Sequence, residues 1–210
     1  MKAFAVVGIH TDIGKTIVSA VITEALGCDY WKPVQAGSID QTDTMTVQSL
    51  VSNSSSKFHD ERYLLAAAMS PHAAAERENI RIDLEELRPI KTTNNLLIET
   101  AGGLMSPMNH ESTMLDYVVH YNLPVLFVSR AYLGSINHTL LCLEMLAVKK
   151  IKLLAMIYSG DRNEESESFI ATYTKVEKVI HVPMMPELNA VAVKQEAERI
   201  QPMLRNYLEL

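Results

Sequence analysis

The segment Gly8–Thr16, with the sequence Gly-Ile-His-Thr-Asp-Ile-Gly-Lys-Thr, constrains this chain more than any other stretch. An apolar run over residues 3–7 precedes it, and a helical pattern over residues 17–22 follows it. In a glycine-bounded turn between a strand and a helix, backbone N–H groups and the helix N-terminus can surround a phosphate group. We therefore predict a nucleotide site, in which Lys15 reaches the terminal phosphates and the Thr16 hydroxyl holds Mg²⁺.

The spacing of this loop departs from the usual phosphate-binding pattern. That pattern has about four residues between its first glycine and the Gly-Lys-Thr triplet, whereas the segment between Gly8 and Gly14 is one residue longer. The alternative interpretation is a glycine turn that only begins a helix and leaves Lys15 in solvent. Its position after the first strand of an alternating chain favours the nucleotide site.

Short apolar runs alternate with helical patterns along the rest of the chain. This alternation predicts an α/β fold with a single doubly wound, mostly parallel sheet and helices on both faces, like that of P-loop NTPases, in one domain over residues 1–210. Residues 63–68 fit either a helical turn or a short strand. The other strands are expected at residues 30–34, 94–101, 123–128, 152–158 and 179–182, and the main helices at 40–51, 112–120, 135–148, 164–178 and 191–208.

Composition restricts the partners and the compartment. The formal net charge of −6, without a basic cluster, argues against nucleic acid as a partner. Only two cysteines, Cys28 and Cys142, are present, and two lone thiols are typical of a reducing cytoplasm. We see neither a signal peptide nor an apolar run long enough to cross a membrane, and we expect a cytoplasmic protein without a membrane partner.

Charged residues at the ends of apolar strands are the next candidates, because ligands of such folds lie beyond the carboxyl ends of the strands. Glu99 could hold Mg²⁺, or it could form an internal ion pair away from any site. Lys32 could stabilise a transferring phosphoryl group, or it could lie in solvent. Asp43 could be a second Mg²⁺ ligand, or an acid that complements a helix dipole.

Several motifs in one order and spacing resemble the dethiobiotin synthetase family, over about residues 4–160. That family has the same longer phosphate loop. The segments that carry the resemblance are Gly8–Thr16, Lys32–Gly37, Asp43, Ser70–His72, Glu99–Gly103 and Leu133–His138.

The resemblance implies ATP- and Mg²⁺-dependent ring closure in biotin biosynthesis. In this reaction 7,8-diaminononanoate and CO₂ (or bicarbonate) form a carbamate, and ATP phosphorylates it to a carbamic-phosphoric mixed anhydride. The second amine then closes the ring to dethiobiotin. A carbamate oxygen is already nucleophilic, so such a site needs positioning and charge neutralisation more than a strong base.

The resemblance also implies roles for individual residues. Catalysis is assigned to Lys15 and Lys32, and the metal to Thr16, Asp43 and Glu99. The nucleotide is assigned to Asp12, Ile13, Gly14, Lys15, Thr16, Ile17, Asp43, Glu99, Thr100, Ala101, Gly102, Ser159, Pro183 and Met184. The substrate is assigned to Thr11, Ala36, Ser38, Gly134, Ser135, Ile136 and Asn137. In the family, the last four receive the substrate carboxylate from the neighbouring subunit, so a homodimer is implied.

Four residues depart from the family pattern, and the first of them, His10, replaces a common Asp, Asn or Thr. Ala36 replaces a Ser or Thr near the substrate, so that one hydrogen bond is lost or supplied by Ser38. Thr100 replaces a glycine and could crowd a close backbone approach. Ser159 stands where the family often has an Asn that reads the purine, so ATP is expected while GTP and CTP stay open.

Two other functions compete with this one. A related P-loop amide or carboxylate-amine ligase with another substrate would explain Ala36 and Thr100 as adaptations. A switch or partitioning ATPase that acts by binding partners is the third hypothesis. The strand end Lys32-Pro33-Val34 disfavours it, as does the lack of a second lysine near the start of the phosphate loop.

Overall fold

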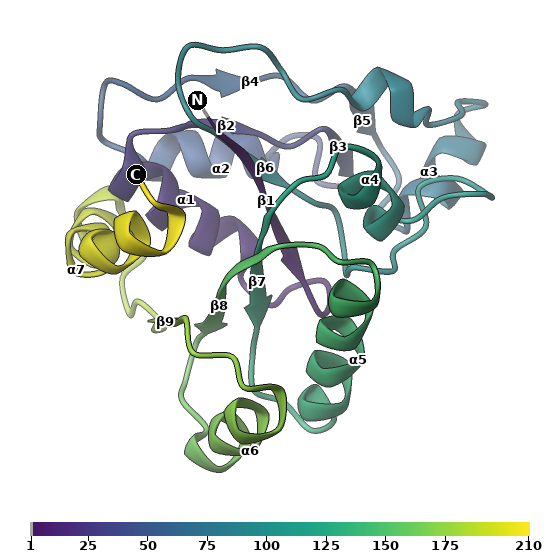
Figure 1. Ribbon diagram of the computed structural model, residues 1–210. Coiled ribbons are helices and arrows are strands. Elements are labelled where there is room, and N and C mark those ends of the chain that lie inside the picture. The colour runs from purple at the N-terminus through teal and green to yellow at the C-terminus, as the bar shows by residue number, and fades with distance from the viewer. Residues whose placement is uncertain (1) are drawn as a thin grey trace.

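The computed structural model describes residues 2–210, and a parallel sheet of seven strands forms its centre (Figure 1). The strand order is β4-β2-β6-β1-β7-β8-β9, and every neighbouring pair is parallel. The predicted doubly wound parallel fold is therefore confirmed. The strands are β1 (Ala3–Gly8), β2 (Asp29–Trp31), β4 (Phe58–His59), β6 (Leu96–Glu99), β7 (Val125–Ser129), β8 (Leu153–Ser159) and β9 (Val179–Val182).

Helices cover both faces of this sheet. On one face, α1 (Lys15–Leu26), α2 (Asp43–Leu50) and α7 (Ala190–Leu208) pack together, and α4 (Met114–His120) and α5 (Ser135–Val148) lie on the other side (Figure 1). Helix α6 (Glu164–Thr174) packs beside α5. No helix within residues 2–210 is long and apolar enough to cross a membrane.

A small second layer lies beside the main sheet. Strands β3 (Val34–Ala36) and β5 (Tyr63–Leu65) pair in parallel, and α3 (Pro71–Arg77) packs against both of them. A 3₁₀ turn, η1 (Leu84–Leu87), follows in the chain. This layer brings the segment after β2 back over the carboxyl end of the main sheet.

The apolar runs identified in the sequence become central strands that are buried on both faces. All five residues of β7 and all four of β6 are buried, as expected when helices cover a parallel sheet on both sides. Burial of these side chains from water is the main force that holds the layers together.

Strand register brings three separate parts of the chain together at the carboxyl end of the main sheet. Val6 of β1 pairs with Glu99 of β6, so Glu99 lies beside the strand that leads into the Gly8–Thr16 loop. Trp31 of β2 pairs with Ile98 of β6, so the next residue, Lys32, lies beside Glu99. Backbone pairing alone therefore places a lysine and a carboxylate next to the loop.

The strand expected over residues 30–34 is confirmed at Tyr30 and Trp31, but its continuity to Val34 is wrong. The structure has β2 ending at Trp31 and β3 beginning at Val34 in a different sheet. Pro33 lies between them, and proline cannot donate a hydrogen bond to a strand ladder. The break leaves Lys32 free of the ladder and turned toward the site.

Other expected boundaries differ from the observed ones. Helix α6 ends at Thr174 rather than at residue 178, because Lys175 adopts a left-handed conformation with φ of 59°. The helix expected from residue 40 begins at Asp43, where the Thr42 hydroxyl accepts a hydrogen bond from the Met45 N–H. The short edge strand β4 was not predicted, since two residues give no periodic pattern.

Candidate functional site

The Gly8–Thr16 loop joins β1 to α1 as the sequence predicted. Helix α1 begins at Lys15, and Gly14 before it has a φ of 91°, a conformation that favours glycine. A Cβ atom at Gly14 would lie 2.3 Å from the Ser159 Oγ atom, so only glycine fits against the end of β8. The unpaired N–H groups of the first helical turn are available to an anion.

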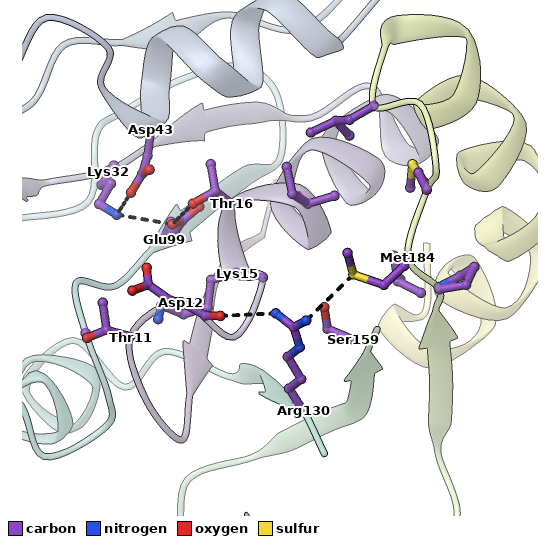
Figure 2. Close-up of a pocket in the computed structure, with 17 residues that line it drawn as sticks. Thr11, Asp12, Lys15, Thr16, Lys32, Asp43, Glu99, Arg130, Ser159 and Met184 are labelled. Carbon is purple, nitrogen blue, oxygen red and sulfur yellow. Dashed lines mark hydrogen bonds and ion pairs between the residues drawn. The ribbon is translucent and has the colours of Figure 1, made fainter. Parts of the chain in front are cut away.

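Charged side chains converge beside this helix start (Figure 2). The buried Lys32 ammonium forms ion pairs with Asp43 and, at 3.2 Å, with Glu99 Oε1. The Thr16 hydroxyl donates a hydrogen bond to the same Glu99 oxygen at 3.1 Å. Burial disfavours the charged form of Lys32, but the attraction of Glu99 and Asp43 outweighs it and raises the pKa of Lys32 above its ordinary value. Lys32 is therefore a fixed positive charge.

Lys15 has a different electrostatic environment. Its Nζ atom donates a hydrogen bond to the His10 carbonyl oxygen at 2.8 Å, folding the side chain back over the loop. Burial lowers its pKa to about 8, although Glu99 partly opposes the shift. Lys15 is therefore a cation held in a poorly solvated place, which an incoming phosphate would stabilise.

A first cavity of about 450 Å³ opens between the loop and the ends of β8 and β9. Its wall has the charged cluster on one side and, on the other, an apolar slope formed by residues 182–185 and Leu188 (Figure 2). This arrangement suits the phosphates and the base of a nucleotide. The lining residues are Thr11, Asp12, Gly14, Lys15, Thr16, Ile17, Lys32, Asp43, Glu99, Gly102, Arg130, Ser159, Val182, Pro183, Met184, Met185 and Leu188.

A second cavity of about 560 Å³ lies under β3 and α3 and shares a wall with the first. Thr11, Asp12, Lys32, Asp43 and Gly102 line both cavities. The other lining residues are Gln35, Ala36, Ser38, Ala68, Met69, Ser70, Pro71, Ala101 and Ser106. Lys32 and Asp43 thus stand at the junction, where groups bound in the two cavities would meet.

Most sequence-predicted site residues line one of these cavities, but six do not. Ile13 is buried in the core, and Thr100 directs its hydroxyl to the Val6 carbonyl oxygen at 3.0 Å. Gly134–Asn137 begins α5 and lies outside both cavities of its own chain. Gly134 and Asn137 are exposed, Ile136 is half-buried and Ser135 is buried. The predicted role of these four residues stays a prediction.

Sequence reasoning missed several residues that the structure brings to the site. Arg130 follows β7 and donates a hydrogen bond to the Asp12 carbonyl oxygen at 3.4 Å (Figure 2). It is a charge at a strand end, so the rule that selected Lys32 and Glu99 could have found it. Tyr30, whose hydroxyl donates to Glu99 Oε2 at 3.0 Å, gave no signal because it reads as an ordinary aromatic residue of a buried strand.

The residues present fit a magnesium ion bound together with a nucleotide. Within residues 2–210 no cluster of three or more His, Cys, Asp or Glu side chains has a metal-binding arrangement. Magnesium, however, is usually held by one or two carboxylates together with phosphate oxygens and water. Thr16, Asp43 and Glu99 supply two carboxylates and a hydroxyl, all oxygen donors, beside the predicted phosphate position.

Comparison with known proteins decides the family. A family model described as an AAA domain matches residues 2–192. An ATP-dependent dethiobiotin synthetase of Christiangramia forsetii is 41% identical over 97% of this chain and 98% of its own length. The chain belongs to the dethiobiotin synthetase family.

Another member of this synthetase family, from Cytophaga hutchinsonii, is 43% identical over 87% of this chain and 88% of its own length. Solved structures outside the family share the fold. A MinC:MinD cell division protein complex of Aquifex aeolicus has a TM-score of 0.58 at 15% identity, covering 100% of this chain and 96% of that one. A ParA family ATPase of Chlorobium tepidum has a TM-score of 0.57 at 12% identity, covering 100% and 99%.

The lowered pKa of Lys15 predicts how nucleotide affinity depends on pH. Lys15 loses its proton near pH 8 in the free protein, whereas a bound phosphate would keep it charged. Below that pH the Kd for ADP should be constant. Above it the Kd should rise by up to about tenfold per pH unit, because each binding event must first restore the proton. Calorimetric titration of ADP in EDTA would measure this.

The matched control for this measurement is Lys15→Arg, which keeps its charge over the whole range. Its Kd should stay flat from about pH 7 to about pH 9.5. An equal rise in both proteins would contradict the assignment of the titration to Lys15.

Proposed function

We propose that this protein catalyses the ATP- and Mg²⁺-dependent conversion of 7,8-diaminononanoate and CO₂ to dethiobiotin in biotin biosynthesis. The observation that carries the proposal is the position of Lys32 in the wall shared by the two cavities. The phosphate loop lines the first cavity, and the second cavity, which adjoins the first at Thr11 and Asp12, is large enough for a chain of nine carbons. Membership of the family supplies the choice of substrate.

The substrate would lie in the second cavity with its two amines toward Lys32. One amine adds to CO₂ and releases a proton, and the resulting carbamate oxygen attacks the γ-phosphorus of ATP, with ADP as leaving group. The second amine then attacks the carbamate carbon, and phosphate leaves as the ring closes. Thr11, Ala36 and Ser38 would line the substrate, with Ser38 available for the hydrogen bond that Ala36 cannot form.

Lys15 and Lys32 would neutralise charge during the transfer. Fixed cations near the transferring group stabilise the transition state without reorganising water. Lys32 stays protonated because Glu99 and Asp43 raise its pKa, so it acts as a charge rather than as a base. Thr16, Asp43 and Glu99 would hold Mg²⁺, which supplies charge neutralisation on the phosphate oxygens.

ATP would occupy the first cavity, with its phosphates at Asp12–Ile17 and its base on the apolar slope. Gly102 lines both cavities and Ala101 lines the second, so their backbone can approach the transferring phosphoryl group closely. Ser159, Pro183 and Met184 would surround the base. Ser159 offers a single hydroxyl, and a comparison of ATP, GTP and CTP as substrates would establish the base preference.

A homodimer would complete the substrate site. Helix α5 begins at Ser135 after Gly134, and its first turn has no side-chain cap. The N-terminus of a helix favours a carboxylate. The adjoining surface is apolar, since the exposed fractions are 103% for Leu133, 58% for Leu141 and 70% for Val148. We propose that Gly134–Asn137 of one subunit bind the substrate carboxylate of the other, in a cytoplasmic enzyme without nucleic acid partners.

The first prediction from this mechanism concerns Lys32. Lys32→Met should lower kcat for dethiobiotin formation by about 10²-fold to 10³-fold, because a preorganised charge is lost from the transition state. The affinity for ADP should change little. Product is measured by mass spectrometry with diaminononanoate, bicarbonate, Mg²⁺ and ATP.

The control for that prediction is Lys91→Met, at an exposed lysine that lines neither cavity, and its kcat should equal that of the wild type. Near-normal turnover of Lys32→Met would remove Lys32 from the mechanism. Absence of product from the wild type, with ATP hydrolysis stimulated by another protein, would favour a switch ATPase instead.

The shared site predicts complementation between two inactive variants. Lys15→Ala damages the nucleotide site, and Asn137→Ala damages the site offered to the partner. A mixed dimer of the two has one intact site, so an equal mixture after subunit exchange should recover about a quarter of wild-type activity. A mixture of Lys15→Ala with Lys32→Ala, both in one site, should recover none. Lack of recovery in the first mixture would contradict a site shared between subunits.

A further inference from the structure

We propose that Tyr30 is a positioning residue for the metal-binding carboxylate of Glu99. Its hydroxyl donates a hydrogen bond to the Oε2 atom of Glu99, and this contact keeps the Oε1 atom directed at Thr16 and Lys32. This inference rests on the proposed function in one respect, the assignment of Glu99 to Mg²⁺.

The two oxygens of Glu99 have separate partners. Oε1 accepts hydrogen bonds from Thr16 at 3.1 Å and from Lys32 at 3.2 Å. Oε2 accepts one from the Tyr30 hydroxyl at 3.0 Å, and Tyr30 is its only hydrogen-bond donor among residues 2–210. Oε1 therefore faces the proposed metal and phosphate position, and Oε2 faces the interior of the protein.

The position of Tyr30 makes this contact rigid. Tyr30 lies in β2 between β4 and β6, and its backbone pairs with Leu97, two residues before Glu99. The side chain has no exposed surface, and its ring lies against Phe58 with centroids 6.5 Å apart. The tyrosine ring therefore has no freedom to follow a rotating carboxylate.

A carboxylate without this contact would be poorly oriented. The terminal torsion of a glutamate has a broad, shallow energy profile, so hydrogen bonds rather than the rotamer fix the plane of the carboxylate. A residue that forms a hydrogen bond to a metal-binding side chain orients that side chain, and its removal typically lowers the affinity for the metal by about 10-fold to 100-fold. A buried Oε2 atom without a donor is also unfavourable, and this favours a rotation of the carboxylate away from Thr16 that gives Oε2 a new hydrogen-bond partner.

Tyr30 acts only through Glu99, because it lines neither cavity and touches neither proposed ligand position. Its removal should therefore affect the metal and leave the metal-free nucleotide unaffected. A tyrosine that only fills the core would show the opposite pattern, with lower stability of the fold and unchanged metal affinity.

The test is Mn²⁺ binding to the protein–ADP complex, followed by electron paramagnetic resonance of the free ion, and it needs no turnover. Tyr30→Phe keeps the ring and removes the hydroxyl. We expect the Kd for Mn²⁺ to rise by about tenfold and the Kd for ADP in EDTA to stay within about twofold of the wild type. The control is Tyr117→Phe, at a buried tyrosine of α4 whose hydroxyl has no partner in the described part of the chain, and it should bind Mn²⁺ normally.

A double-mutant cycle with Glu99→Gln provides the second measurement. If Tyr30 acts through Glu99, adding Tyr30→Phe to Glu99→Gln should weaken Mn²⁺ binding by less than about twofold. An additive loss in the double variant would overturn the proposal.

A wild-type Kd for Mn²⁺ in Tyr30→Phe would also overturn it, and Thr16→Ala then shows which assumption failed. If Thr16→Ala binds Mn²⁺ more weakly than the wild type, the assignment of the metal site stands and only the role of Tyr30 is rejected. Normal binding in Thr16→Ala as well would reject the proposed metal site and Tyr30 together.

Discussion

The site depends on one buried lysine held between two carboxylates. Lys32 is 5% exposed, and Glu99 is 1% exposed. Burying such charges costs free energy that a pair repays only when its hydrogen bonds are complete, so a cluster of this kind is weak evidence for stability. The position of the cluster beside the Gly8–Thr16 loop indicates a role in phosphate binding instead. The protein has already removed these charges from water, and a bound phosphate would meet them without further reorganisation.

The arrangement also explains why the two lysines differ. Lys32 forms ion pairs with two carboxylates and keeps its proton, whereas at Lys15 burial outweighs the attraction of Glu99 and Asp43 and lowers the pKa to about 8. Lys32 is neutralised by the protein itself, and Lys15 would be neutralised by the nucleotide. The arrangement of these two lysines belongs to the site rather than to the fold, because function resides in the site that a fold supports.

Much of the fold and of the candidate site could be predicted from the sequence, for clear physical reasons. Buried parallel strands are continuous apolar runs, and the phosphate loop depends on local backbone geometry, so both leave direct patterns in the sequence. Lys32 and Glu99 stood out because a charge at the end of an apolar strand is costly unless it has a partner. The alternative of a lysine in solvent is wrong, since Lys32 is buried. Glu99 does form an internal ion pair, with Lys32, in the wall of the first cavity, and its role in binding the metal stays a prediction.

Contacts that depend on register and on breaks in strands could not be predicted. The separation of β2 from β3 at Pro33 appears only when the second sheet is seen. The pairing of Trp31 with Ile98, which places Lys32 beside Glu99, needs a register that one sequence does not give. Tyr30 looks like any core aromatic until its hydroxyl is found on Glu99. The single-domain interpretation and the role of Gly134–Asn137 stay predictions.

The most direct test of the central claim is a crystal structure of the protein with Mn²⁺ and a non-hydrolysable ATP analogue, with the metal located by its anomalous signal. The claim predicts a peak within coordination distance of the Thr16 hydroxyl oxygen, between Glu99 and Asp43, with Lys32 directed at the γ-phosphate. A metal bound away from Thr16 and Glu99, or a triphosphate out of reach of Lys32, would contradict it.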